Sequence, residues 1–215
     1  MSGLFITMEG TDGAGKTTQI KLLKDYLEKK GFSVLSTREP GGNAISEKIR
    51  EIIIDVENKK MNARTEALLY AASRAQIVSE VIVPTLKKGD IVICDRFVDS
   101  SIVYQGIARK LGIETVESIN HFATDGLEPD ITFLLKLDPE QSIERKKQQE
   151  QLDRIESENS YFHKRVYYGY LELAEKFPER IKVIDAFDDI DTIHKKIVQY
   201  VENLFLTKYW AVSND

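Results

Sequence analysis

The chain has 215 residues, of which 42% are hydrophobic and 30% charged, so it can bury a sizeable core and matches a single domain. Its formal net charge is -5 at pH 7, so no overall positive field would gather a nucleic-acid polymer or an anionic membrane. Its one cysteine, Cys94, excludes a disulfide framework, and neither a signal-peptide pattern nor an apolar run of about 18 residues occurs, so we expect a cytoplasmic protein.

Short apolar runs alternate with amphipathic stretches along the chain. The apolar runs predict buried strands at residues 4–9, 32–37, 90–95, 130–135 and 181–186. The amphipathic stretches predict helices at residues 17–30, 44–54, 66–86, 113–124 and 157–176. Asp138 followed by Pro139 predicts one further helix start. Because strands that alternate with helices form βαβ units, we expect an α/β fold with five parallel strands flanked by helices.

The first predicted strand leads into the stretch GTDGAGKT, which fits the pattern G-x-x-x-x-G-K-[ST] of a phosphate-binding P-loop. A strand precedes this stretch and a helix follows it, as the motif requires. Glycines let successive backbone N–H groups turn toward an anion, and the helix N-terminus adds its positive dipole end. The alternative is a glycine-rich turn that binds nothing, and the agreement of motif and context argues against it. The predicted nucleotide-binding residues are Gly10, Thr11, Asp12, Gly13, Ala14, Gly15, Lys16, Thr17 and Thr18.

Three side chains near this loop have predicted roles in phosphate chemistry. Lys16 is expected to contact the β- and γ-phosphates of a nucleoside triphosphate, and the Thr17 hydroxyl to ligate Mg²⁺. The strand predicted at residues 90–95 ends at Asp95, whose carboxylate could hold the same metal directly or through water. The predicted metal residues are therefore Thr17 and Asp95.

A P-loop indicates a nucleoside triphosphate but leaves the fate of the γ-phosphate open. A GTPase switch requires a guanine-binding N-K-x-D pattern, which the chain lacks. A small-molecule kinase requires a second anion site, and Arg38, Arg74 and Arg96 are candidates because a guanidinium can hold a phosphate bidentately. The alternative from another class is a binding module that responds to ATP without transferring its phosphate.

Six stretches follow one another in the order and spacing found in thymidylate kinases, and the chain resembles that family in its bacterial form. They are EGTDGAGKTTQ, TREPGG, LLYAASRAQ, DRFVDSSIVYQG, PDITFLLKLDP and LDRIE. The resemblance extends from about residue 4 to 201. It implies a nucleoside monophosphate kinase fold over residues 1–205, with a small mobile lid and usually in a homodimer. The implied reaction transfers a phosphoryl group from ATP to dTMP with Mg²⁺, giving dTDP.

The same resemblance implies an acceptor site. Its residues are Arg38, Tyr70, Arg74, Arg96, Ser101, Tyr104 and Gln105. Arg38 and Arg96 would hold the dTMP phosphate, as two phosphorylated substrates that meet in line require fixed cations between them. Arg74 would contact the thymine carbonyl, with a surface salt bridge as the alternative. Tyr70 would stack on the base, with an ordinary core aromatic as the alternative.

The remaining residues implied by the resemblance lie around the sugar and the base. Ser101 and Gln105 would approach the base imide. Tyr104 would pack on the deoxyribose and crowd out a 2′-hydroxyl. Asp12 would approach the 3′-hydroxyl, or would only stabilise its loop. Glu39 would hold Mg²⁺ through water or fix Arg38, and the sequence leaves both open.

The polar segment around residues 144–157 falls where the family has its mobile lid. Position 13 is glycine, so the cation that stabilises the transition state is expected from this lid. The candidates are Arg145, Lys146, Lys147 and Arg154, and Arg154 in LDRIE is favoured first. Such a lid would also exclude water from the transfer. With Lys16, Arg96 and Asp12, the lid residues Arg154 and Arg145 make up the predicted catalytic set.

Two regions have weaker predictions. By resemblance, the loop near Asp185 and Ala186 borders the adenine of ATP. The tail at residues 206–215 lies outside the resemblance, and we expect its Tyr209 and Trp210 to be loosely held. The predicted helix at residues 66–86 is a plausible homodimer interface. The nearest rival function is another nucleotide kinase of the same fold, although Arg38 and Arg96 together favour an acceptor that already carries phosphate.

Overall fold

The computed structural model describes residues 3–138, 141 and 152–212, with the backbone alone for residues 207–212. Its strands are β1 (Leu4–Glu9), β2 (Val34–Arg38), β3 (Ile91–Asp95), β4 (Ile131–Lys136) and β5 (Ile181–Asp185). All paired strands are parallel, in the order β2-β3-β1-β4-β5. The predicted five-stranded parallel sheet is confirmed.

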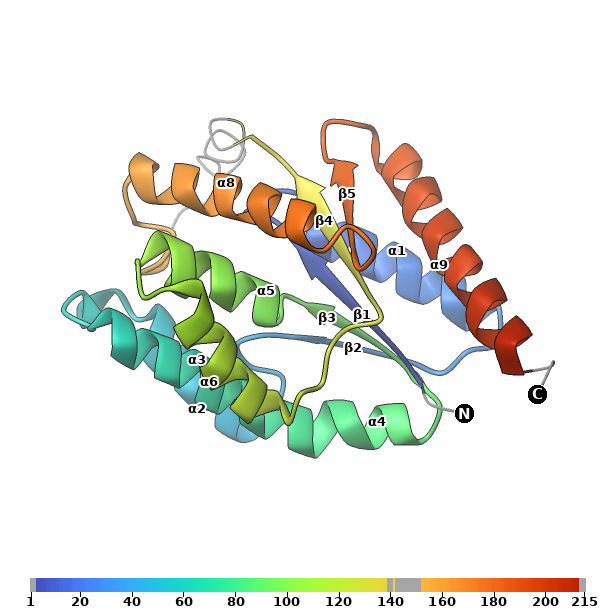
Figure 1. Ribbon diagram of the computed structural model, residues 1–215, viewed down its shortest axis with the longest axis horizontal. Helices are drawn as coiled ribbons and strands as arrows, with labels where there is room; N and C mark the ends of the chain where they lie inside the picture. Colours follow the sequence, from blue (N-terminus) through green and yellow to red (C-terminus); the bar gives the residue numbers. More distant parts are fainter. Residues whose placement is uncertain (1–2, 139–140, 142–151, 213–215) are drawn as a thin grey trace.

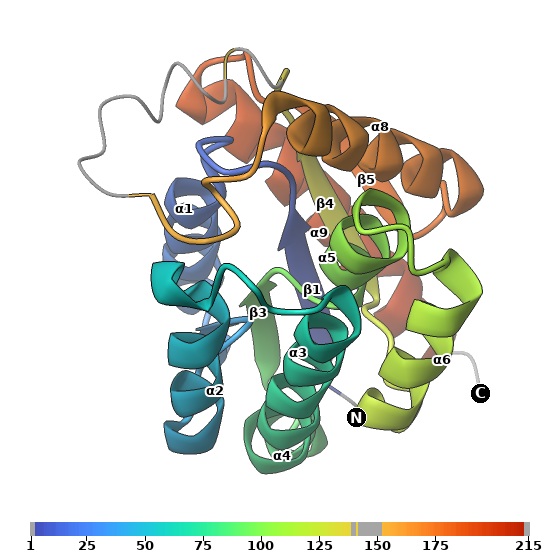
Figure 2. The same ribbon diagram turned by 90° about the vertical axis from the view of Figure 1, so that its left-hand side faces the viewer.

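Helices flank the sheet on both sides (Figures 1 and 2). They are α1 (Lys16–Lys29), α2 (Ala44–Ile54), α3 (Ala63–Ile77), α4 (Val83–Lys87), α5 (Val98–Ser101), α6 (Ile113–Thr124), α8 (Ser160–Lys176) and α9 (Ile190–Val212). Asparagine side chains cap α2, α3 and α8, and the cap of α8 is Asn159, whose Oδ1 accepts from the Phe162 N–H at 2.9 Å. The helix start predicted at Asp138 and Pro139 lies outside the described residues. Within the described part of the chain, no helix is long and apolar enough to cross a bilayer.

The central strand β1 sends alternate residues to the two faces of the sheet. Leu4, Ile6 and Met8 pack with α1 and α9, which lie together on one face (Figure 1). Phe5 packs on the other face against the chain that follows α3. Because helices cover both faces, the inner strands β1, β3 and β4 are buried almost throughout, whereas the edge strands β2 and β5 also contain exposed residues.

Two helical regions were not predicted. Helix α9 was missed although Ile193, Ile197 and Val201 recur every four residues and are buried against the sheet. It runs to Val212, so the backbone of the tail is helical as far as that residue, and the loose packing of Tyr209 and Trp210 stays a prediction. The second region is α5 with the π-helical segment η3 (Ile102–Ala108), where the Arg109 N–H reaches the Tyr104 carbonyl at 2.9 Å.

The helix predicted at residues 66–86 is α3, a π-helical segment η2 (Val78–Ile82) and α4 in direct succession. A short 3₁₀ turn, η1 (Val56–Asn58), connects α2 toward α3. In η3, the wider winding leaves residues 102–106 all buried, so neighbouring side chains reach the interior together. Insertions of this kind re-aim side chains, and η3 carries two of the predicted acceptor residues.

The strands β1, β2 and β3 end at the same edge of the sheet. Met8 pairs with Asp95, and Arg38 pairs with Asp95 from the other side. The three predicted motifs that follow these strands therefore meet at one edge. The carboxyl ends of parallel strands are where ligands bind in folds of this type.

Candidate active site

The loop after β1 has the geometry of an anion nest. Gly10, Gly13 and Gly15 have φ values of 131°, 77° and 93°, which side chains rarely adopt. A Cβ atom at Gly10 would also collide with the Leu135 carbonyl oxygen on β4. Gly15 is the N-cap of α1, and among the described residues no side chain caps this helix end. The first turn of α1 is thus open to an anion.

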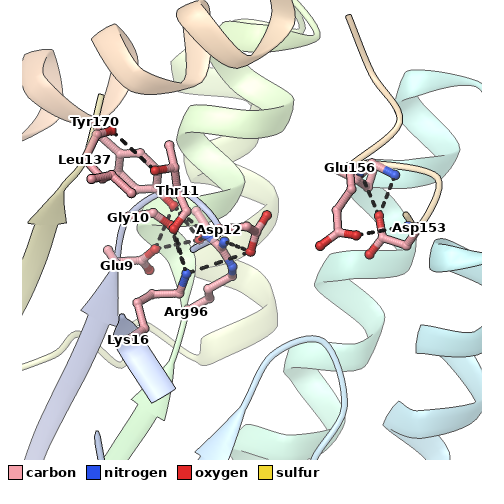
Figure 3. Close-up of polar contacts among 12 residues, drawn as sticks. Glu9, Gly10, Thr11, Asp12, Lys16, Arg96, Leu137, Asp153, Glu156 and Tyr170 are labelled. Carbon is pink, nitrogen blue, oxygen red and sulfur yellow. Dashed lines mark hydrogen bonds and ion pairs between the residues drawn. The ribbon is translucent and has the colours of Figure 1, made fainter. Parts of the chain in front are cut away.

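Lys16 lies folded over this loop. Its ammonium donates to the carbonyl oxygens of Gly10 and Thr11, both at 3.1 Å, and lies 3.9 Å from the Asp12 carboxylate (Figure 3). Burial, and secondly the charge of Arg96, lower the pKa of Lys16. A phosphate would offer this cation a charged partner in place of two neutral carbonyls.

A cleft of about 380 Å³ opens above the loop. Its lining residues are Asp12, Gly13, Gly15, Lys16, Thr17, Thr18, Arg38, Glu39, Arg50, Asp95, Arg96 and Glu156. The structure thus brings together the predicted metal residues Thr17 and Asp95. The buried Oδ1 of Asp95 has no hydrogen-bond partner in the described structure, so it fits a hydrated Mg²⁺, which prefers oxygen ligands. Among the described residues, no three His, Cys, Asp or Glu side chains converge as a metal site.

A second cavity of about 130 Å³ adjoins this cleft. Its lining residues are Asp12, Glu39, Pro40, Arg50, Ile54, Tyr70, Arg74, Arg96, Ser100, Ser101, Tyr104, Gln105, Asp153, Ile155 and Glu156. Six of the seven predicted acceptor residues are among them, and only Arg38 is not. Both spaces are lined by the cations Arg50 and Arg96 and by three carboxyl side chains, those of Asp12, Glu39 and Glu156, so two arginines lie where two anionic groups would meet.

Arg96 is held in a strained backbone conformation at the junction of the two spaces. Its φ of 70° lies in the left-handed region, which costs a non-glycine residue roughly 1–2 kcal/mol. The guanidinium donates to Asp12 at 2.7 Å (Figure 3). It also donates to the Tyr170 hydroxyl at 3.1 Å and to the Ser100 hydroxyl at 3.3 Å. An observed strain of this kind points to a functional position.

Glu9 supports Arg96 from inside the protein. Its carboxylate accepts hydrogen bonds from Ser100 at 2.5 Å and Tyr170 at 2.9 Å, the same two side chains that contact Arg96. Burial raises the pKa of Glu9, with the charge of Asp99 adding to the effect. Glu9, the last residue of β1, thereby fixes the position of Arg96, the first residue after β3.

Arg74 is 1% exposed and forms a buried ion pair with Glu39 at 2.6 Å. The alternative of a surface salt bridge is therefore wrong. Its contacts with Glu39, Ser101, Asn120 and the Phe97 carbonyl use four of its five N–H donors among the described residues. One donor is left for a ligand.

Glu39 pairs with Arg74 and not with Arg38, so the prediction that it fixes Arg38 is wrong. Burial raises the pKa of Glu39 to about 7, although the charge of Arg74 opposes this effect. Its Oε1 has no partner in the described structure, and the residue lines both the cleft and the cavity. The other prediction, contact with Mg²⁺ through water, stays open.

The aromatic residues of the cavity are Tyr70 and Tyr104. Burial raises the pKa of both hydroxyls, so both stay neutral. The Tyr104 ring centroid lies 5.4 Å from the Arg96 guanidinium carbon, which places it beside the junction of the two spaces. Tyr70 lines the cavity and is only partly buried, so a ligand can reach it, unlike an ordinary core aromatic.

The structure places Arg38 differently from the prediction and adds Arg50. Arg38 lines the cleft only, and it is half exposed and ion-paired with Glu47 at 2.9 Å. Arg50, which the sequence reasoning missed, lines both spaces and donates to the Pro40 carbonyl at 3.1 Å. The available signal was its position on the buried side of α2, one turn from the buried residues Ser46 and Ile53.

Arg154 is not brought to the P-loop. It is 6% exposed, donates to the Ile53 carbonyl at 2.7 Å and pairs with Glu66 at 2.7 Å, and it lines neither space. Its neighbours Asp153 and Glu156, which were not predicted, line the smaller cavity opposite Asp12 (Figure 3). Burial raises the pKa of Asp153. Arg145, Lys146 and Lys147 lie outside the described residues.

The loop predicted to border adenine lies beside α1, and its contact with the base stays a prediction. Gln19 on α1 donates to the Ile190 carbonyl at 2.9 Å, and Ala186 is buried with its N–H bound to the Lys136 carbonyl. Neither Asp185 nor Ala186 lines the cleft or the cavity.

Known proteins share both the sequence and the fold of this chain. A family model described as thymidylate kinase matches residues 8–197. The thymidylate kinase of Caldanaerobacter subterraneus subsp. tengcongensis is 52% identical over 202 residues, covering 94% of this chain and 96% of that protein. That of Exiguobacterium sp. is 48% identical over 200 residues, covering 93% and 94%. The crystal structure of thymidylate kinase from Ehrlichia chaffeensis matches with a TM-score of 0.75 and 31% identity, covering 94% of this chain and 99% of that one. The chain therefore belongs to the thymidylate kinase family.

Proposed function

We propose that this thymidylate kinase, which phosphorylates dTMP to dTDP, holds ATP in the cleft above the P-loop and dTMP in the adjoining cavity. The observation that carries this arrangement is that Arg50 and Arg96 line both spaces. Two substrates that both carry phosphate repel each other, so transfer requires fixed positive charge at the place where they meet. A binding module for ATP alone has no use for the second space.

On the donor side, the nest and Lys16 bind the β- and γ-phosphates of ATP. The transferring group spreads negative charge over its equatorial oxygens, and Lys16, Arg50 and Arg96 offset that charge. An acceptor phosphate oxygen is already ionised at neutral pH, so the reaction does not require a general base. Thr17 and Asp95 would hold Mg²⁺, which supplies further charge neutralisation at the phosphate oxygens when bound.

On the acceptor side, the base lies between Tyr70 and the polar edge formed by Arg74, Ser101 and Gln105. Tyr70 stacks on the ring, and the uncommitted N–H of Arg74 contacts a base carbonyl. Tyr104 lies against the deoxyribose. Asp12 holds Arg96 at 2.7 Å, which supports a positioning role beside its predicted approach to the 3′-hydroxyl.

The origin of one further cation stays a prediction. Gly13 leaves the P-loop without a basic side chain at that position, so Arg145 and Arg154 are the predicted sources of transition-state charge. Arg154 would have to leave a buried ion pair with Glu66, and breaking such a pair costs about 3–5 kcal/mol. This cost favours Arg145. The enzyme is expected to work in the cytoplasm and as a homodimer.

Thermal unfolding in the absence of ATP tests the acceptor cavity. We expect dTMP to raise the melting temperature, because a ligand at about 100 times its Kd stabilises the native state by about 2.7 kcal/mol. Thymidine, which lacks the phosphate, should stabilise the protein much less. A protein that ignores dTMP would contradict the proposal.

The same measurement distinguishes whether Arg50 or Arg38 binds the phosphate of dTMP. Arg50→Ala should abolish most of the stabilisation by dTMP, because Arg50 lines the acceptor cavity. Arg38→Ala is the matched control and should retain most of it, because Arg38 is paired with Glu47 outside that cavity. The reverse result would restore Arg38 as the phosphate ligand.

A further inference from the structure

Gln105 presents one side of its amide to the acceptor cavity. It is buried, its Nε2 donates to Glu66 Oε1 at 3.0 Å, and its Oε1 has no partner in the described structure. The two ends of a glutamine amide have nearly the same shape, so their orientation follows from their hydrogen-bond partners. The partner of Gln105 is therefore what decides whether the cavity offers an acceptor or a donor.

Glu66 can only accept hydrogen bonds. It lies on α3 and is 1% exposed. Its carboxylate accepts hydrogen bonds from Arg109 at 3.1 and 3.2 Å and from Arg154 at 2.7 Å, in addition to the one from Gln105. Burial alone would raise the pKa of Glu66, but the hydrogen bonds from Arg109, Gln105 and Arg154 outweigh burial and lower it. The carboxylate is thus ionised at neutral pH, and an ionised carboxylate has no proton to donate.

The edge of the cavity then has a defined pattern of donors and acceptors. Arg74 supplies a donor, and the Oε1 of Gln105 supplies an acceptor. Thymine and uracil offer a carbonyl next to the N3–H, which complements a donor next to an acceptor. Cytosine offers an amino group next to an unprotonated N3. Its amino donor would face the donor of Arg74, and its N3 acceptor would face the acceptor of Gln105. A buried polar mismatch of this kind is strongly rejected.

We infer that Glu66 is a positioning residue for base selection, because it turns the oxygen of Gln105 toward the base and so makes the cavity accept thymine or uracil and reject cytosine. This inference rests on the proposed function, in which the cavity holds the pyrimidine of the acceptor. Glu66 itself does not line the cavity. It acts only through Gln105.

The variant Glu66→Gln tests the inference, with kcat/KM measured for dTMP and for dCMP. The neutral amide can donate as well as accept, so Gln105 is free to turn its nitrogen toward the base. We expect the ratio of kcat/KM for dTMP over dCMP to fall about 10- to 100-fold. A purely structural role would lower both values by the same factor, and that result would overturn the inference.

Arg109→Gln is the matched control. It removes donors from the same carboxylate, but Arg109 does not line the cavity, and its described side-chain hydrogen bonds go to Glu66 and Glu158. We expect a lower melting temperature and an unchanged ratio, because Glu66 still accepts from Gln105. A ratio that falls as far as in Glu66→Gln would mean that general loosening, not amide orientation, sets the selectivity.

The exchange Glu66→Gln with Gln105→Glu covers the case in which the single variant does not fold. In this double variant the amide at 66 donates to the carboxylate at 105, which again presents an oxygen to the base. We expect the preference for dTMP over dCMP to be retained within about tenfold. Loss of the preference would contradict the inference. A wild-type enzyme without dTMP turnover would instead overturn the proposed function.

Discussion

Arg96 has a strained backbone conformation that places its side chain between the cleft and the cavity. The residue has a φ of 70°, and its guanidinium is held by Asp12, Ser100 and Tyr170. Ser100 and Tyr170 in turn donate hydrogen bonds to the Glu9 carboxylate. The position of this charge is therefore set before any substrate binds, which is how a site stabilises charge without reorganising during the reaction.

The pair of variants Arg96→Ala and Arg96→Gly separates the side chain from the backbone. Both should lose turnover with dTMP by about 10²–10³-fold, because both lack the same charge. Arg96→Gly should be about 1 kcal/mol more stable than Arg96→Ala, because glycine adopts a positive φ without strain. Urea unfolding measures the difference, and equal stability of the two variants would mean that the strain is absent.

Glu39 makes a prediction about pH. Its pKa is raised from 4.5 to about 7 in the folded protein, so between these values the folded state keeps a proton that the unfolded chain has released. The unfolded state binds fewer protons there, and the free energy of unfolding falls as pH rises through this window, by up to about 3 kcal/mol. Glu39→Gln does not titrate and provides the reference.

Chemical denaturation of both proteins at several pH values checks this expectation. The stability of Glu39→Gln relative to the wild type should increase from about pH 4.5 to about pH 7 and then level off. A difference that does not change with pH would show that the carboxyl of Glu39 is not perturbed by its burial beside Arg74.

Most individual site residues could be predicted because they occur in motifs. The nest, Asp95 and six of the seven acceptor residues come together as expected. Arg50 could not be singled out, since it belongs to no motif and its role depends on how α2 packs. Arg154 shows the opposite case: its motif is matched, but the buried carboxylate of Glu66 takes its guanidinium away from the P-loop.

At the scale of elements, the P-loop is fixed against the neighbouring strand β4. Gly10 approaches the Leu135 carbonyl so closely that no Cβ atom fits, whereas a Cβ atom at Gly15 would meet nothing within 4 Å. Both residues have a positive φ. A side chain at Gly15 would thus meet backbone strain alone, whereas a side chain at Gly10 would meet both strain and a steric clash.

The matched variants Gly10→Ala and Gly15→Ala test this distinction. Gly15→Ala should destabilise the protein by about 1–2 kcal/mol through strain alone. Gly10→Ala should cost about 3–5 kcal/mol, because overpacking against β4 adds to the strain. Unfolding in urea without ligands gives both values, and equal losses would contradict the close approach to Leu135.

The sheet could be predicted more completely than the helices around it. The inner strands β1, β3 and β4 are buried on both faces and leave long apolar runs between polar boundaries, and the edge strands β2 and β5 leave shorter ones that the sequence also indicates. The π-helical winding of η3 has no such signal, because its residues 102–106 are buried by the wider turn and not by a helical period. The predicted lid lies mostly outside the described residues and stays a prediction.

At the scale of the whole molecule, the helices α2, α3 and α6 lie side by side and present apolar residues to solvent (Figure 2). Phe122 on α6 is 90% exposed and Leu68 on α3 is 57% exposed. Single exposed apolar residues are normal on monomers, whereas a contiguous apolar patch over adjacent helices is typical of an interaction surface. We propose this surface as the homodimer interface.

Phe122→Glu should therefore shift the protein toward the 24.6 kDa monomer. We expect the dissociation constant of the dimer to rise at least tenfold, because a charge would be buried in the interface. Tyr168→Glu is the control, since Tyr168 is an exposed aromatic residue (65%) on another helix, α8. Equilibrium sedimentation at micromolar concentration measures both. A wild-type protein that sediments as a monomer would remove the proposal.

In the proposed arrangement, two phosphorylated substrates meet between the P-loop cleft and the adjoining cavity, and one of them is dTMP. The most direct measurement is ADP release from ATP and Mg²⁺ with dTMP, dUMP, dCMP, AMP, GMP and thymidine offered separately. We expect selective turnover with dTMP and very little with thymidine, since Arg50 and Arg96 are placed to bind an acceptor phosphate. Turnover with thymidine in preference to dTMP, or with none of the acceptors, would contradict it.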